Sequence, residues 1–81
     1  MKLPRDWSGL HLAKALGRLG YEIDHQTGSH IRLTRHGIAG DQHLTIPAHD
    51  PLKVGTLNAI LKVVCEHTGL KRDALLAEVL S

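Results

Sequence analysis

The chain has 81 residues, which is enough for one small domain and too few for two. It holds no Phe, one Trp and one Tyr, which nearly excludes RNA-binding modules that stack bases on aromatic rings. The formal net charge of +2 permits a polyanionic partner without requiring one.

The cysteine content and the N-terminal segment bear on cellular location. The single cysteine, Cys65, excludes an internal disulfide and fits a reducing compartment. Pro4, Arg5 and Asp6 come before any apolar run, so we expect neither a signal peptide nor a membrane span. The sequence therefore predicts a cytoplasmic protein.

The first predicted element is a helix that begins after Ser8 and ends at Gly20, because Ser is a favoured N-cap and Gly a favoured C-cap. The apolar residues that recur at helical spacing are Leu12, Ala13, Leu16 and Leu19, and Leu10 lies near the start. Lys14 and Arg18 lie four residues apart on the other face. We interpret the Lys14 and Arg18 side chains as solvated rather than as contacts to phosphate.

Alternating apolar and polar residues then predict strands. Tyr21 and Ile23 mark the core side of a first short strand, which ends in a turn at residues 26–28. A second strand covers residues 29–34.

A loop over residues 36–42 leads to a third predicted strand over residues 43–47. The side chains expected on the core side of the second and third strands are Ile31, Leu33, Leu44 and Ile46. Those expected on the opposite, polar side are His30, Arg32, Thr34, His43 and Thr45.

Two further helices complete the prediction. One begins near Gly55-Thr56 and ends at Gly69, with an apolar stripe of Leu57, Ile60, Leu61, Val64 and Cys65. A short third helix over residues 72–80 offers Leu76, Val79 and Leu80. The order helix, three strands, helix predicts an α+β fold in which the helices pack on one face of a three-stranded antiparallel sheet. The other face stays solvated.

Four segments, in this order and at these separations, resemble the HicA toxin family: SGLHLAKALGRLGY, HQTGSHIRL, LTIPAH and KVGTLNAIL. The similarity runs from about Ser8 to Leu70. It implies a fold like that of a double-stranded-RNA-binding domain, ribonuclease activity on messenger RNA, and neutralisation by a HicB-type antitoxin. We expect a single toxin domain over residues 1–81, with its core at 8–70 and a C-terminal helix at 72–80.

The resemblance also implies which residue is catalytic. The family's essential histidine stands in a Gly-Ser-His motif, which here is Gly28-Ser29-His30. His30 therefore takes the catalytic role, and Gly28 and Ser29 are expected at the RNA-binding site. One departure is His25, where the family often has Arg. This difference bears on a phosphate contact and not on the chemistry.

The residues themselves support such chemistry. RNA carries its own nucleophile, the 2′-hydroxyl, so an enzyme can cleave it without a metal by positioning the phosphodiester and moving protons. His30 can serve as general acid or base, and Arg32, one step along the same face, can hold the phosphate. Lys53 is the first choice for a further phosphate contact, because it precedes a helix N-terminus, and a solvated loop residue is the alternative. The second proton-transfer group stays open among Ser29, His43, His49 and Lys53.

Two alternatives remain. A zinc site is disfavoured. The chain has one cysteine, and the spacings of its central histidines match no recognised set of zinc ligands. These histidines are His25, His30, His36, His43 and His49. A non-catalytic double-stranded-RNA-binding module is the more serious rival, but it would need a lysine cluster where the second long helix has only Lys62 beyond Lys53. We therefore favour an RNA-cleaving toxin that uses no cofactor or metal. We expect RNA and an antitoxin as its partners and no association with a membrane.

Overall fold

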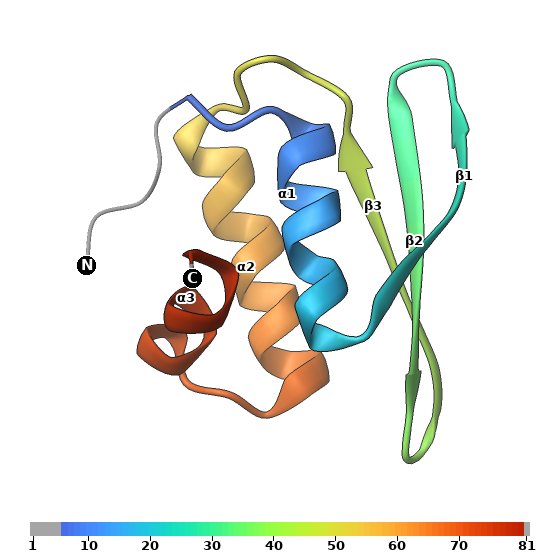
Figure 1. Cartoon of the computed structure of the whole chain (residues 1–81), viewed down its shortest axis with the longest axis vertical. Helices are drawn as coiled ribbons and strands as arrows, with labels where there is room; N and C mark the ends of the chain where they lie inside the picture. The colour runs from blue at the N-terminus through green and yellow to red at the C-terminus, as the bar shows by residue number, and fades with distance from the viewer. Residues whose placement is uncertain (1–5, 81) are drawn as a thin grey trace.

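The computed structural model describes residues 6–80, so the expectation for residues 1–5 lies outside the described residues. The elements in chain order are α1 (Gly9–Ala15), a 3-10 turn η1 (Leu16–Leu19), β1 (Tyr21–Thr27), β2 (His30–Gly37), β3 (Gly40–Pro47), α2 (Val54–Thr68) and α3 (Arg72–Leu80). This order confirms the predicted α+β fold, similar to a double-stranded-RNA-binding domain (Figure 1). Within residues 6–80, no helix is long and apolar enough to cross a membrane.

The three strands form one antiparallel sheet in the order β1-β2-β3. Helices α1 and α2 pack on one face of this sheet, and α3 lies against the helices on the side away from it (Figure 1). None of the described helices covers the opposite face. We call that opposite side the open face of the sheet.

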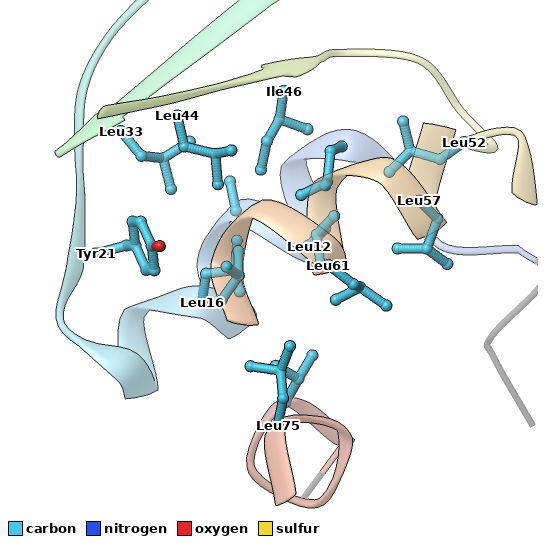
Figure 2. Packing of buried hydrophobic residues seen from close by; sticks show 14 of the residues in the cluster. Leu12, Leu16, Tyr21, Leu33, Leu44, Ile46, Leu52, Leu57, Leu61 and Leu75 are labelled. Atoms are coloured by element: carbon cyan, nitrogen blue, oxygen red, sulfur yellow. The ribbon is translucent and has the colours of Figure 1, made fainter. Parts of the chain in front are cut away.

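Aliphatic side chains fill the space between the sheet and the helices, as the composition predicts (Figure 2). The buried residues of α2 are the predicted stripe of Leu57, Ile60, Leu61 and Val64, whereas Cys65 is only partly buried. Helix α3 adds Leu75, Leu76 and Val79. Leu75 was not predicted, and Leu80, which was assigned to the apolar stripe, is 36% exposed.

The first helix begins and ends at its predicted caps. The Ser8 hydroxyl accepts a hydrogen bond from the backbone N–H of His11 at 3.1 Å. The last turn tightens into η1, and Gly20 then ends it with a φ of +93°. Leu10, near the start of the helix, is 42% exposed and does not belong to the apolar face.

Both hairpins are tighter than predicted. Strand β1 continues to Thr27 and β2 begins at His30, so the turn consists of Gly28 and Ser29 rather than residues 26–28. Gly28 has a φ of +55°, a conformation that is strained for other residues. The predicted loop over residues 36–42 shrinks in the same way to two residues, because the strands keep pairing as far as Gly37 and Gly40.

A bulge in β1 changes which of its side chains share a face. Ile23 pairs with Leu33, but the next pair joins His25 to Arg32, so Asp24 is an extra residue in the ladder. Simple alternation placed Ile23 in the core. It is instead 42% exposed, because β1 is an edge strand of the sheet.

Candidate functional site

Backbone hydrogen bonds join three segments at one end of the molecule, the upper end in Figure 1. The N–H of Ala48, just after β3, donates to the carbonyl oxygen of Ser29 in the first hairpin turn at 2.6 Å. The N–H of Gly9, the first residue of α1, donates to the carbonyl oxygen of His49 at 2.9 Å. The turn, the end of β3 and the start of α1 are therefore held together.

Gly9 lets α1 approach β3 more closely than any other residue would. A Cβ atom at this position would lie 1.9 Å from the carbonyl oxygen of Pro47. The role of Gly9 could not be predicted from the sequence, because a contact between residues so far apart leaves no local pattern. The only signal was its position directly after the N-cap.

The structure brings the Gly28-Ser29-His30 motif and Arg32 together as predicted. His30 is the first residue of β2 and pairs with Thr27 on one side and Pro47 on the other. It is exposed, as is Arg32, whereas the alternating Ile31 and Leu33 are fully buried. His30 and Arg32 therefore share the open face. Among residues 6–80, neither side chain has a hydrogen bond or an ion pair.

Lys53 lies apart from this pair. It occupies the N-cap position of α2, is exposed, and caps the helix without a side-chain hydrogen bond. The helix begins at Val54, slightly before the predicted Gly55-Thr56. The start of α2 lies at the same end of the molecule as the first hairpin turn (Figure 1), beyond the loop that follows β3. Lys53 thus lies at the same end of the molecule as the motif but not beside His30.

A line of hydrogen bonds crosses the open face further along the strands. The Thr34 hydroxyl donates to the carboxylate of Asp24, so it accepts from Nδ1 of His43 at 3.1 Å. Thr34, predicted to be solvated, is only 7% exposed because these neighbours cover it. His43 pairs with Thr34, four residues from His30 along β2, which is about 14 Å at about 3.4 Å per residue. His43 is therefore too far from His30 to act on the same phosphate.

A second polar network closes the opposite end of the fold. The carbonyl oxygen of His67, near the end of α2, accepts hydrogen bonds from the guanidinium of Arg35 and the amide of Gln42, both at 3.2 Å. The Tyr21 hydroxyl and Nδ1 of His67 are 2.7 Å apart. Burial raises the pKa of Tyr21 to about 12, although the nearby Arg35 charge opposes this. This network holds α2 to the sheet and lies far from His30.

We expect Tyr21 to make the stability of the fold pH-dependent in the alkaline range. The ordinary pKa of 10.0 applies to the unfolded chain and about 12 to the folded one. The stabilisation is therefore complete below pH 10 and is lost as pH rises through 12, by about 2 kcal/mol. Urea unfolding of the wild type and of Tyr21→Phe at pH 8 and pH 11 measures it. The variant should show a smaller fall, and parallel falls in the two proteins would contradict this role.

The other exposed polar pair on the sheet lies near the second hairpin. Nδ1 of His36 and a carboxylate oxygen of Asp41 are 2.7 Å apart, and this hydrogen bond raises the pKa of His36. Both side chains are exposed, so the pair adds little to stability. His36 is an imidazole on the open face that is remote from His30, which makes it a useful control position.

Two pockets among the described residues lie away from His30. Within the described part of the chain, no three His, Cys, Asp or Glu side chains are placed to hold a metal ion. One pocket of about 300 Å³ lies beside Arg35 and His67, and another of about 390 Å³ lies between α1 and α3. His30 lines neither pocket. The candidate site consists of exposed side chains on the open face.

Comparison with protein families matches residues 11–64, about two thirds of the chain, to a family described as the HicA toxin of bacterial toxin–antitoxin systems. The matched segment includes the Gly28-Ser29-His30 motif, Arg32 and Lys53. Searches of curated proteins and of solved structures returned no significant match. A match over this much of the chain, on the fold expected for the family, settles its membership. The chain belongs to the HicA toxin family of bacterial toxin–antitoxin systems.

Proposed function

We propose that this toxin is a metal-independent endoribonuclease that cleaves messenger RNA in the cytoplasm, with His30 as the catalytic residue. The observation that carries the proposal is the position of His30. It is an exposed imidazole beside Arg32 on the open face, in a chain that belongs to a toxin family. An imidazole that is not engaged with other side chains is available to exchange protons with a substrate.

The reaction needs few protein groups. The 2′-hydroxyl of the RNA attacks the adjacent phosphorus, and His30 either takes the proton of that hydroxyl or supplies one to the leaving oxygen. Arg32 holds the phosphate and stabilises the charge that develops on its oxygens. Gly28 and Ser29 present their backbone to the RNA. Apart from its neighbours in the chain, no heavy atom lies within 4 Å of the position that a Gly28 Cβ would take. Lys53 contacts another phosphate, further along the RNA chain.

A HicB-type antitoxin is the proposed inhibitor. Toxins of this class act only when their partner is absent, so the partner must block substrate access or chemistry. The open face is uncovered, and Arg32 there offers a positive charge. Acidic side chains on the antitoxin would complement that charge. The same surface then binds RNA in the active toxin and the antitoxin in the inhibited complex.

A non-catalytic RNA-binding module is the second candidate, and the fold itself favours it. Such modules bind duplex RNA by shape, through phosphate and 2′-hydroxyl contacts. Helix α2 offers one lysine, Lys62, in addition to Lys53 at its start. That is a sparse set of phosphate contacts for a module that depends on them. Only the ribonuclease would cut the RNA strand, so RNA cleavage distinguishes the two candidates.

We expect the purified toxin to cleave single-stranded RNA in the presence of EDTA. The 2′-hydroxyl supplies the nucleophile and protein side chains move the protons, so chelation should not slow the reaction. Denaturing gel electrophoresis of an end-labelled RNA measures cleavage, and addition of the antitoxin should stop it. Loss of activity with EDTA and recovery with zinc would show that the reaction depends on a metal. RNA binding without cleavage would favour the second candidate.

A further inference from the structure

The bulge in β1 places His25 on the open face beside the proposed catalytic residue. Side chains of directly paired residues point to the same side of a sheet. His25 pairs with Arg32, and Thr27 pairs with His30, so all four belong to the open face. Without the extra residue at Asp24, His25 would have faced the helices. The bulge thus adds an imidazole to the site.

His25 and His30 are diagonal neighbours across two adjacent strands. Diagonal residues of an antiparallel pair are about 7–8 Å apart, so their side chains can reach opposite sides of one bound group. Arg32 lies directly opposite His25 and two residues from His30. A phosphate held by Arg32 would therefore lie within reach of both imidazoles. His25 is exposed and, within residues 6–80, its side chain has no hydrogen bond or ion pair.

The other candidates for a second proton-transfer group are placed less well. His43 is bound to Thr34 and lies about 14 Å along the strands from His30, at about 3.4 Å per residue. After Pro47 the chain leaves the sheet, so neither His49 nor Lys53 has a position in the strand ladder beside His30. Ser29 lies in the turn and lacks a group that titrates near neutral pH. His25 is the remaining imidazole on the face of His30 and next to it.

We propose that His25 is the second proton-transfer group of the reaction, whereas the family resemblance had implied only a phosphate contact at this position. This inference rests on the proposed function. One imidazole takes the proton of the 2′-hydroxyl as the new bond from the 2′-oxygen to phosphorus forms. The other, protonated, gives its proton to the 5′-oxygen as the bond from phosphorus to that oxygen breaks. The products are a 2′,3′-cyclic phosphate and a 5′-hydroxyl. Water then restores both imidazoles to their starting protonation states.

Three variants separate proton transfer from phosphate binding. His25→Ala removes the group, and His25→Arg keeps a positive charge and hydrogen-bond donors but cannot exchange a proton. His36→Ala is the matched control, because it removes an exposed imidazole about 20 Å away on the same face, at about 3.4 Å per residue. We expect kcat/KM for an RNA oligonucleotide to fall at least about 100-fold in both His25 variants. His36→Ala should cleave like the wild type, and all three should keep the wild-type Tm.

A substrate with sulfur in place of the 5′-bridging oxygen identifies the two roles. A thiolate leaves without being protonated, so this substrate removes the need for a general acid. One variant of the pair His25→Ala and His30→Ala should regain activity on it, and the other should not.

The outcomes have separate meanings. Wild-type activity of His25→Ala or His25→Arg would overturn the assignment of His25 while leaving His30 and the proposed function in place. Loss of activity in His25→Ala with no rescue of either variant would mean that His25 only binds RNA, and would also overturn it. Absence of cleavage by the wild-type protein would overturn the proposed function itself, and this inference with it.

Discussion

Replacement of His30 by Ala is expected to abolish RNA cleavage and growth inhibition while leaving the fold and antitoxin binding intact. His30 begins β2 on the face opposite the buried Ile31 and Leu33, so its truncation opens no cavity. The loss of a proton-transfer group costs about 100- to 10,000-fold in rate. Gel-based cleavage, growth of cells that express the variant alone, thermal unfolding and antitoxin co-purification together test this expectation.

The same four measurements separate a catalytic His30 from a structural one. A structural histidine would lower the Tm along with the activity, whereas we expect an unchanged Tm. His43→Ala is the control for general loss of polar surface on the open face, and it should retain much more activity than His30→Ala. Growth arrest by His30→Ala at matched expression would reject the site assignment and the mechanism with it.

Local signals explain why much of the fold could be predicted. The helix stop at Gly69 has a positive φ of +74°, as a glycine C-cap requires. The alternation of Ile31 and Leu33 with His30 and Arg32 correctly separated the buried face of β2 from the open one. In both cases the residue type and its immediate neighbours favour a single local structure, so no information on long-range contacts is needed.

Features that depend on distant contacts could not be predicted. Asp24 forms a bulge in β1, and alternation before and after it differs by one residue, which hid the position of His25. Thr34 is covered because Asp24 and His43 reach it from neighbouring strands. No local pattern carries such contacts, since they appear only once the strand register is known.

The candidate site also combines a feature that could be predicted locally with features that depend on distant contacts. The identity of His30 came from a short motif, whereas the neighbours of His30 came from the pairing of three strands. A motif reports what a residue does in relatives. The register reports which other groups lie within reach of the same phosphate, and here it changed the candidate for the second proton-transfer group from residues such as His43 to His25.

Substitution of Gly9 by Ala should destabilise the fold and disturb the end of the molecule that carries the site. The new Cβ would lie 1.9 Å from the carbonyl oxygen of Pro47, and both are held by backbone, so α1 and β3 must move apart. This separation also stretches the hydrogen bond from Gly9 to His49. Overpacking of this kind costs about 1–3 kcal/mol, and the weakened hydrogen bond adds to that.

A loss of about 3 kcal/mol corresponds to a fall in Tm of at least about 10 °C in a domain of this size. Thermal unfolding followed by circular dichroism measures it. Gly17→Ala is the matched control: its Cβ meets nothing within 4 Å, so it should be neutral or stabilise by up to about 1 kcal/mol. Because Pro47 pairs with His30, Gly9→Ala should also slow RNA cleavage at temperatures where it is still folded. Equal Tm values for Gly9→Ala and Gly17→Ala would mean that α1 does not approach β3 this closely.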